Sequence, residues 1–265
     1  MLPTIEQVHH LPRYTGERIV PGSSPPAFLQ EHAARYVFAG RFCRDKKVLD
    51  VASGLGYGTD YLRKVGARVT GLEIDEDSVR HSRIQYPESD FVRGDAEQLP
   101  ANWDATFDVV VSFETIEHLP HPERFLAGVF QCLRPGGLFV CSTPNKDLFL
   151  LQGAQAFHCK EYYSREFVRF IGSRFRVRSI YGQSFRPRWH VVPMFSFALL
   201  KRMMKFARIK SLGLGAAMKK ADVSSPFEGK TIAEARILSR FLPAELPASR
   251  MPTFLVVVAE KNGIE

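Results

Sequence analysis

Between residues 47 and 183, short apolar segments alternate with segments of helical periodicity, and this alternation constrains the fold more than any other feature of the sequence. Alternating strands and helices favour parallel strand pairing, with helices packed on both faces of the sheet. Strands are predicted over residues 47–52, 68–74, 89–94, 107–113, 137–144, 176–183 and 253–261, and helices over 57–66, 76–86, 122–133 and 164–175. The sequence therefore predicts an α/β fold.

The chain divides into four parts around one core, because 265 residues suffice for a single α/β domain with insertions. The parts are an N-terminal arm and helix (1–42), the core (43–184), a basic insertion (185–250) and the last strand of the core sheet (251–265). Helical spacing of apolar residues within the insertion predicts helices over 195–209 and 231–241. We expect the insertion to roof a substrate pocket or to contact a second subunit.

A stop signal follows the predicted helix over residues 122–133. Its sequence is Arg134-Pro135-Gly136-Gly137. Proline cannot continue a helix, and glycine tolerates positive φ. These residues therefore predict the end of the helix and a turn into the next strand.

The chain is basic, with 36 Lys and Arg against 28 Asp and Glu and a formal net charge of +8. This excess favours anionic ligands or partners such as nucleotide sugars, nucleic acid or an acidic membrane surface. The four cysteines form no CxxC pair, so neither a zinc ribbon nor a thiol redox motif is indicated. No stretch resembles a signal peptide or reaches the roughly 20 apolar residues of a membrane span, so we expect a cytoplasmic protein.

The segment VLDVASGLGYG predicts a ligand site. Its strand contains Asp50, and Gly54, Gly56 and Gly58 follow before a helix begins. Glycines let the backbone turn tightly and approach a ligand, while the next helix offers unpaired N–H groups at its N terminus. Glu73 ends the second strand, about 20 residues further on, where a carboxylate can accept hydrogen bonds from both hydroxyl groups of a ribose.

Five motifs fall in one register along the chain. They are VLDVASGLGYG, GLEID, RGDAEQLP, FDVVVSFETIEHL and LRPGGLFVCSTPN. In this order and spacing, residues 46–184 resemble the class I methyltransferases that use S-adenosylmethionine (SAM). The resemblance implies a Rossmann-like fold with a seven-stranded, mostly parallel sheet into which the last strand inserts antiparallel. A dinucleotide oxidoreductase is the rival of the same architecture, but GDAEQLP and the EHL and RPGG motifs are not typical of that family.

The resemblance also implies which residues bind the cofactor SAM. They are Asp50, Ala52, Gly54, Gly56, Glu73, Ile74, Asp95, Ala96, Ser112 and Phe113. By this resemblance Glu73 would bind the ribose, Ile74 would pack on the adenine, and Asp95 would accept a hydrogen bond from the adenine amino group. Ala52 is a departure from the family pattern, in which glycine is usual at this position.

Polar residues follow the fourth predicted strand, at the sheet edge where open α/β sheets bind ligands. In Glu114-x-x-Glu117-His118, the three side chains share one face of a helical turn. Resemblance to metal-assisted O-methyltransferases of small RNAs and of quinone biosynthesis implies that Glu114, Glu117, His118 and His158 bind a divalent ion such as Mg²⁺. Without a metal, His118 would be a base or positioning group that faces the substrate. The predicted catalytic residues are His118, Glu117 and His158.

A polar and aromatic cluster lies at the start of the helix predicted over residues 164–175. It contains His158, Glu161, Tyr162 and Tyr163. These residues either line an acceptor pocket or serve packing and the helix start, and the sequence leaves both interpretations open.

The flanking segments bear on the acceptor. The arm RYTGERIVPG resembles the start of methyltransferases from sugar and surface-polysaccharide biosynthesis, which implies O-methylation of a sugar, nucleotide sugar or glycan precursor. An RNA-end 2′-hydroxyl, a quinone-type or other small-molecule acceptor, N-methylation and a non-catalytic SAM-binding subunit remain alternatives. The arm is either a lid with Tyr14 and Arg18 at the site or a strap held by Ile19 and Val20. The segment VVPMFSFALLKRMMKFARIKSLGLG predicts a pocket roof or homodimer contact, with peripheral membrane contact as the alternative.

Overall fold

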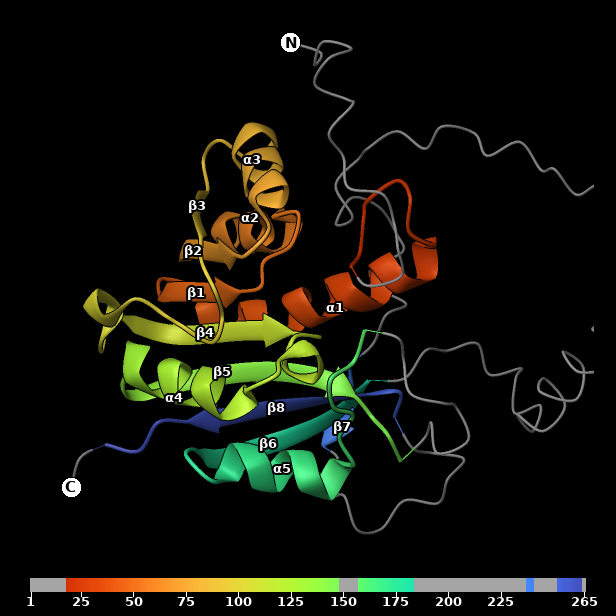
Figure 1. Cartoon of the computed structure of the whole chain (residues 1–265), viewed down its shortest axis with the longest axis vertical. Helices are drawn as coiled ribbons and strands as arrows, with labels where there is room; N and C mark the ends of the chain where they lie inside the picture. Colours follow the sequence, from red (N-terminus) through yellow and green to blue (C-terminus); the bar gives the residue numbers. More distant parts are fainter. Residues whose placement is uncertain (1–17, 148–156, 184–236, 241–251, 264–265) are drawn as a thin grey trace, which may run out of the picture.

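The computed structural model describes residues 18–147, 157–183, 237–240 and 252–263, which form one sheet with helices on both faces (Figure 1). The strands are β1 (Lys47–Val51), β2 (Arg68–Glu73), β3 (Asp90–Arg93), β4 (Phe107–Phe113), β5 (Leu133–Pro144), β6 (Arg176–Gln183), β7 (Ile237–Arg240) and β8 (Phe254–Glu260). Their order is β3-β2-β1-β4-β5-β8-β6-β7. β1 to β5 pair in parallel, and β8 lies antiparallel between β5 and β6. The predicted Rossmann-like sheet with an antiparallel last strand is confirmed.

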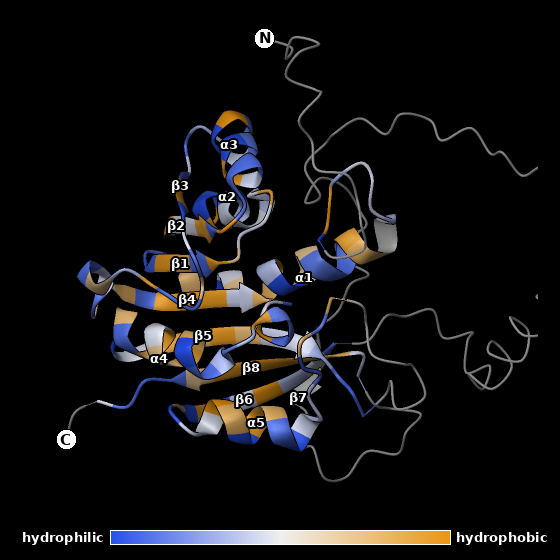
Figure 2. Cartoon of the chain, viewed as in Figure 1, coloured by the Kyte–Doolittle hydropathy of each residue, from blue (hydrophilic) through white to orange (hydrophobic). Residues whose placement is uncertain are grey.

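Side chains alternate between the two faces of the central strands, so each face is apolar and covered by helices. The helices are α1 (Pro26–Cys43), α2 (Tyr57–Lys64), α3 (Glu76–Gln85), α4 (Pro122–Cys132) and α5 (Ser164–Gly172), with the 3₁₀ turns η2 (Ala101–Trp103) and η3 (Ile116–His118). Val109 and Val111 of β4 pack with α1 and α2, while Val110 packs with α4 and α5 on the other face. Figure 2 shows the hydrophobic strands in the centre and hydrophilic residues on the outer helices.

A short edge strand stands where the sequence predicts a helix over residues 231–241. β7 (Ile237–Arg240) pairs antiparallel with β6 and adds an eighth strand to the predicted seven. The helical prediction is therefore wrong for these four residues, because pairing with an open sheet edge overrides a local helical preference. The helix predicted over 195–209 lies outside the described residues.

The predicted end of the helix is confirmed, because α4 ends at Cys132, but the turn predicted at Pro135-Gly136-Gly137 is wrong. These residues belong to β5, and the pairing of β4 with β5 shifts register beside them. Gly136 has a φ of 75°, and its N–H donates to the carbonyl oxygen of Lys261. The segment is therefore a bulged beginning of the strand, in which glycine supplies the positive φ that a bulge needs.

No helix in the described part of the chain is long and apolar enough to cross a membrane.

Candidate active site

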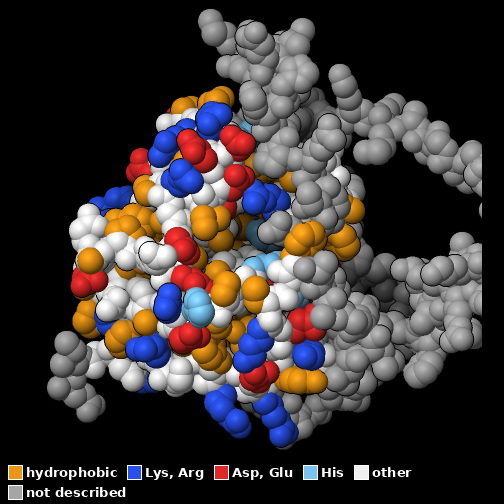
Figure 3. All heavy atoms as spheres, in the orientation of Figure 1, with side chains coloured by type: hydrophobic (Ala, Val, Ile, Leu, Met, Phe, Trp, Pro, Cys, Tyr) orange, Lys and Arg blue, Asp and Glu red, His pale blue; other side chains and the backbone are white. Residues whose placement is uncertain are grey.

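A cavity of about 600 Å³ lies at the carboxyl ends of β1, β2 and β4. Open α/β sheets bind ligands at this edge. Figure 3 shows the hollow, with histidine side chains in it and hydrophobic side chains around it. The described residues that line it come mainly from the loops after β1, β2 and β3, from one face of α1, and from the segments around η3 and residues 157–158. Arg18 and Ile19 of the arm and Phe254 of β8 complete the lining.

The loop between β1 and α2 forms one wall of the cavity. Ala52 and Gly54 line this wall, and both have positive φ, of 60° and 57°. Gly56 does not line the cavity, but it has a φ of 79°, and a Cβ atom there would lie 2.7 Å from the Phe91 ring. Both the backbone conformation and the lack of space therefore require glycine at position 56.

Glu73 links this loop to the end of β2. Its Oε2 accepts a hydrogen bond from the Gly54 N–H at 2.9 Å, and its Oε1 accepts one from the Asp75 N–H at 3.0 Å. The carboxylate is therefore fixed in position, and it lines the cavity. Because a carboxylate has about four acceptor sites, Glu73 can accept further hydrogen bonds from two neighbouring hydroxyl groups of a ligand.

The remaining predicted cofactor residues divide into two sets. Ile74, Asp95, Ala96 and Phe113 line the cavity together with Glu73. Ile74 is 61% exposed, so an apolar side chain is open to a ligand at this point. Asp95 Oδ1 accepts a hydrogen bond from the Glu97 N–H at 2.8 Å, which fixes its orientation. The structure thus groups residues from the ends of β2, β3 and β4 as the resemblance implies.

Asp50 and Ser112 form the second set, because neither lines the cavity. Asp50 is fully buried and accepts hydrogen bonds from the Tyr36 hydroxyl at 3.1 Å and the Thr59 hydroxyl at 2.7 Å. Burial raises the pKa of Asp50 to about 7, although these two hydrogen bonds act in the opposite direction. Ser112 is buried too. The structure therefore places both side chains beneath the site rather than in it.

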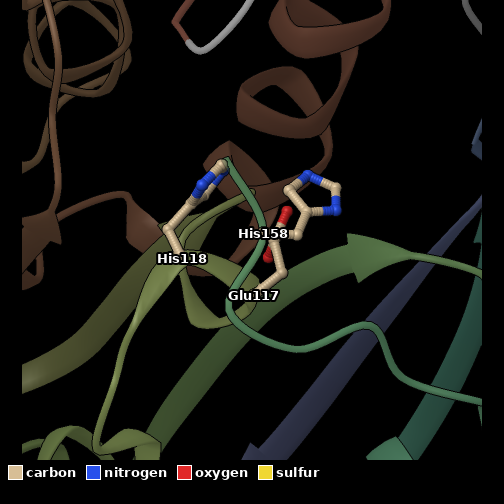
Figure 4. Close-up of side chains that lie close together, drawn as sticks. All are labelled: Glu117, His118 and His158. Carbon is tan, nitrogen blue, oxygen red and sulfur yellow. The ribbon is translucent and has the colours of Figure 1, made fainter. Parts of the chain in front are cut away.

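Glu117, His118 and His158 form a compact cluster on the side of the cavity next to β4 and β5 (Figure 4). Their potential ligand atoms all lie within 4.8 Å of one another. Glu117 and His118 belong to η3, and His158 belongs to the loop before α5. Backbone hydrogen bonds join the two segments, because the Glu117 carbonyl accepts from the N–H groups of Cys159 at 2.8 Å and Lys160 at 3.0 Å.

A backbone carbonyl sets the tautomer of His118. Its Nδ1 lies 2.8 Å from the carbonyl oxygen of Phe157. A carbonyl oxygen can only accept, so Nδ1 carries a proton, and Nε2 of the neutral ring keeps a lone pair. The rings of His118 and His158 meet edge to face, with centroids 4.9 Å apart. His118 can therefore accept a proton or bind a cation through Nε2.

Glu117 is buried, and its two carboxylate oxygens differ. Oε2 accepts a hydrogen bond from the Thr143 hydroxyl at 3.1 Å, whereas Oε1 has no hydrogen-bond partner among the described residues. Burial, and next the charge of Glu114, raise the pKa of Glu117 well above its ordinary value. A buried oxygen without a partner costs about 1–3 kcal/mol, so this position favours a ligand that donates a hydrogen bond or carries positive charge.

Glu114 lines the cavity but is not part of this cluster. Its φ is 53°, and its carboxylate accepts a hydrogen bond from the Ser142 hydroxyl at 2.7 Å. The structure thus brings together three of the four predicted metal ligands. The carboxylate of the fourth, Glu114, is hydrogen-bonded to Ser142 of β5 instead.

Only one member of the predicted polar and aromatic cluster reaches the cavity. His158 lines it, and its Nδ1 lies 3.4 Å from Oε1 of Glu161. Burial, and next the neighbouring His118, lower the pKa of His158. Tyr162 is fully buried against Phe167 in the core, and Tyr163 is exposed without lining the cavity. Packing is therefore the interpretation that holds for Tyr162.

One face of α1 supplies residues that the sequence analysis does not identify. Phe28, Glu31, His32 and Arg35 line the cavity at the i, i+3, i+4 and i+7 positions of this helix. Helical spacing of apolar residues predicts only packing for this segment. The missed signal is that two charged residues and a histidine occupy the face of the helix that packs against the sheet.

Buried contacts fix this face of α1 to the sheet. Arg35 Nη1 donates to Oε1 of Gln183 at 2.7 Å, and the guanidinium lies 4.5 Å from the centroid of the Phe254 ring. Gln183 Nε2 in turn donates to the Glu31 carbonyl at 2.8 Å. These contacts join α1 to β6 and β8, so the Arg35 side chain and the helix backbone at Glu31 are held in place before any ligand binds.

The described end of the N-terminal arm also reaches the site. Arg18 lines the cavity, and its Nη1 donates to Oδ2 of Asp75 at 2.6 Å and to the Ser78 hydroxyl at 2.7 Å. Val20 is fully buried, so this part of the arm is held as a strap while Arg18 faces the site. Tyr14, the other residue predicted to face the site, lies outside the described residues.

Known methyltransferases are similar to this chain in sequence. Residues 49–141 match a family model described as the methyltransferase domain. Over 136 residues the chain is 41% identical to a protein of Mycolicibacterium smegmatis described as a probable S-adenosylmethionine-dependent methyltransferase, a match over 51% of this chain and 52% of that protein. Over 104 residues it is 36% identical to the ubiquinone biosynthesis O-methyltransferase of Maricaulis maris, over 38% of this chain and 41% of that protein. The chain spans about half the length of the curated relatives it matches.

The fold has a counterpart among solved structures. A SAM-dependent methyltransferase of Thermotoga maritima superposes with a TM-score of 0.58 at 14% identity, over 89% of this chain and 93% of that chain. Identity at this level bears on the fold alone. The superposition confirms the predicted Rossmann-like fold. The match to the methyltransferase domain and the sequence relatives support an enzyme of the methyltransferase class.

Proposed function

We propose that this protein is a SAM-dependent methyltransferase that methylates a hydroxyl group of its acceptor. The observation that carries the proposal is the Glu73 carboxylate, fixed by the Gly54 N–H in the same cavity as the free Nε2 of His118. One edge of the sheet thus presents a site for a ribose and a base for a hydroxyl proton. The name of the Maricaulis maris relative, an O-methyltransferase, supports oxygen as the receiving atom.

The cofactor side of the cavity fits SAM. Glu73 would accept hydrogen bonds from the ribose hydroxyls, Ile74 would contact the adenine ring, and Asp95 would accept from the adenine amino group. The amino-acid end would lie against the positive-φ backbone at Ala52 and Gly54, which lines the cavity. Bound SAM supplies a methyl group that its sulfonium already activates, so this chain has to orient the acceptor in line with it.

His118 would take the proton from the acceptor hydroxyl. A neutral alcohol is a poor nucleophile, and a positioned base contributes about 10²- to 10⁴-fold to such reactions. The Phe157 carbonyl holds Nδ1–H, so Nε2 is the atom that receives the proton. Glu117 and His158 flank His118 and would orient the hydroxyl group toward it.

A divalent ion at Glu117, His118 and His158 is a second candidate for the activating group. The cluster geometry favours it, and so does the buried Oε1 of Glu117 that lacks a partner in the described structure. Two imidazoles and one carboxylate suit Zn²⁺ or Mn²⁺ better than the Mg²⁺ that the resemblance implies. A bound ion would supply Lewis-acid activation of the hydroxyl group.

Metal titration separates these two candidates. Calorimetry with Mn²⁺ should detect one site in the wild type that Glu117→Gln weakens, and EDTA should abolish turnover, if the ion is required. Turnover that survives EDTA, with no Mn²⁺ uptake, would leave His118 as the base. Glu123→Gln is the matched control, because it makes the same change at an exposed position.

An acceptor screen tests the proposed function itself. The full chain is incubated with SAM and a panel of hydroxylated compounds, and mass spectrometry measures S-adenosylhomocysteine (SAH) and the methylated product. We expect SAH release that depends on one class of acceptor. Tight SAH binding without release across the panel would instead support the non-catalytic SAM-binding subunit.

Several narrower expectations stay predictions. The sequence favours a sugar, nucleotide sugar or glycan acceptor, with an RNA end as the alternative, and it predicts a cytoplasmic location. The segment 185–250, which would carry the homodimer or peripheral membrane contact, lies outside the described residues except for β7.

A further inference from the structure

The lining of the cavity carries a charge opposite to that of the whole chain. Its described carboxylates are Glu31, Glu73, Asp95, Glu97, Glu114 and Glu117, and its described guanidinium groups are Arg18 and Arg35. Arg18 already pairs with Asp75, and Arg35 is held by Gln183 beside Glu31. The net charge of +8 therefore does not extend to this lining, which is acidic.

An acidic, partly buried cavity disfavours anionic ligands. Two like charges repel more strongly where water is excluded, because the effective dielectric constant is low. Like-charge contacts at interfaces are unfavourable and serve to exclude wrong partners. Phosphorylated acceptors would therefore meet repulsion from cavity carboxylates such as Glu31 and Glu114.

Apolar side chains accompany these carboxylates. Phe28 on α1 and Phe157 before His158 both line the cavity, and they are 49% and 46% exposed. Exposed large aromatic rings at a cavity mark contact surface for an apolar ligand. Phe28 lies one helical turn before Glu31, so one face of α1 presents an aromatic ring next to a carboxylate.

Glu31 is the carboxylate best placed to recognise an acceptor. The Glu114 carboxylate already accepts a hydrogen bond from the Ser142 hydroxyl, and Glu117 belongs to the cluster with His118. Glu31 is 7% exposed and lines the cavity from α1, which Gln183 fixes through the Glu31 carbonyl. The helix backbone that carries Glu31 is therefore held before a ligand arrives, and a buried acceptor group on a held helix selects for ligands that donate a hydrogen bond.

We propose that Glu31 is a specificity-determining residue, which accepts a hydrogen bond from an uncharged, hydroxylated acceptor whose apolar part contacts Phe28 and Phe157. Together with Glu114, it excludes phosphorylated acceptors. This inference rests on the proposed methyl transfer and names the chemical class of its acceptor. It favours neutral alcohols over nucleotide sugars and RNA ends.

A pair of matched probes tests the inference. A vicinal decanediol and decyl phosphate share an apolar chain but differ in charge, and calorimetry measures each on the full chain saturated with SAH. We expect the diol to bind at least about tenfold more tightly than the phosphate, because a fixed charged acceptor and like-charge repulsion act in the same direction.

Substitutions then assign the preference to named residues. Glu31→Gln should reduce the preference for the diol by about tenfold, since it removes a charge but keeps an acceptor oxygen. Phe28→Ala should weaken both probes equally, because both carry the apolar chain. Glu88→Gln and Ile84→Ala are the controls, as both positions are exposed and neither lines the cavity.

The outcomes distinguish this inference from the proposed function. Equal binding of the two probes, with SAH uptake intact, would overturn the inference alone. An unchanged preference in Glu31→Gln would remove Glu31 from recognition. Failure of the wild type to take up SAH would contradict the proposed function and the inference with it.

Discussion

The two sides of the cavity are built from different kinds of group. On the cofactor side, backbone groups dominate: a positive-φ loop after β1 and the N–H groups of Gly54 and Asp75 that fix Glu73. On the acceptor side, side chains from α1, η3 and the loop before α5 meet across long stretches of sequence. The difference teaches that the proposed cofactor site depends on local conformation, whereas the proposed acceptor site depends on how distant segments pack.

The largest effect is expected at His118, on the acceptor side. Substitution by alanine should lower kcat by about 10²- to 10⁴-fold and leave SAH affinity within about twofold, because the base acts on the acceptor and not on the cofactor. Steady-state kinetics and calorimetry measure the two quantities. His121→Ala, an exposed position outside the cavity, is the control. A parallel loss of SAH affinity would break the separation of the two sides.

Gly56 tests the backbone basis of the cofactor side. Gly56→Ala should destabilise the fold by about 2–4 kcal/mol, since it combines a positive φ with a Cβ that meets Phe91 and Ser82. Chemical unfolding measures the loss. Gly263→Ala, which has open space and no positive φ, should change little. A stable Gly56→Ala protein with normal SAH affinity would contradict this role.

The buried Asp50, which lies beneath the cofactor side, should make the stability of the fold depend on pH. Burial raises the pKa of Asp50 from 3.8 to about 7 in the folded state. The folded state therefore holds a proton that the unfolded state releases, so this group makes the protein less stable as pH rises from about 4 to about 7. The slope is at most about 1.4 kcal/mol per pH unit.

Unfolding of Asp50→Asn across this range measures the contribution. The variant should lose part of the pH dependence of the wild type, and the exposed Asp90→Asn should keep it. Parallel curves for the wild type and Asp50→Asn would show that Asp50 ionises normally in the folded protein.

The smallest effect is expected at the arm. Arg18→Ala should cost less than about 1 kcal/mol of stability, because the ion pair with Asp75 is partly exposed to water. It should also leave the preference for uncharged acceptors intact, since Arg18 is already paired. A large loss of that preference would show that Arg18 belongs to the acceptor side. Arg80→Ala, in an exposed ion pair of α3, is the control.

The sequence predicts the cofactor side better than the acceptor side for a physical reason. Glycine spacing, strand periodicity and the position of Glu73 are local properties, and the structure brings Glu73, Ile74 and Asp95 together in one cavity. The pairing of β7 depends instead on an available sheet edge. The resemblance implies that Asp50 contacts SAM. In the structure, Tyr36 and Thr59 bind the Asp50 carboxylate, which does not line the cavity, and no local sequence pattern predicts this packing.

The acceptor side shows the same limit. His118 and His158 are 40 residues apart in the sequence. They come together because hydrogen bonds join η3 to the loop before α5. The motif predicts the residue types of this cluster but not that Glu114 is held by Ser142. Glu31 and Arg35 belong to no recognisable motif. They line the cavity because of the way α1 packs on the sheet, which the local sequence does not reveal.

Calorimetry of SAH binding to the wild type and to Glu73→Ala tests the central claim most directly. We expect one site in the wild type and an affinity at least about tenfold weaker in the variant, because two ligand hydrogen bonds to a fixed carboxylate are lost. Glu88→Ala should bind like the wild type. A wild type that takes up no SAH, or a Glu73→Ala protein with undiminished affinity, would contradict a cofactor site at the end of β2.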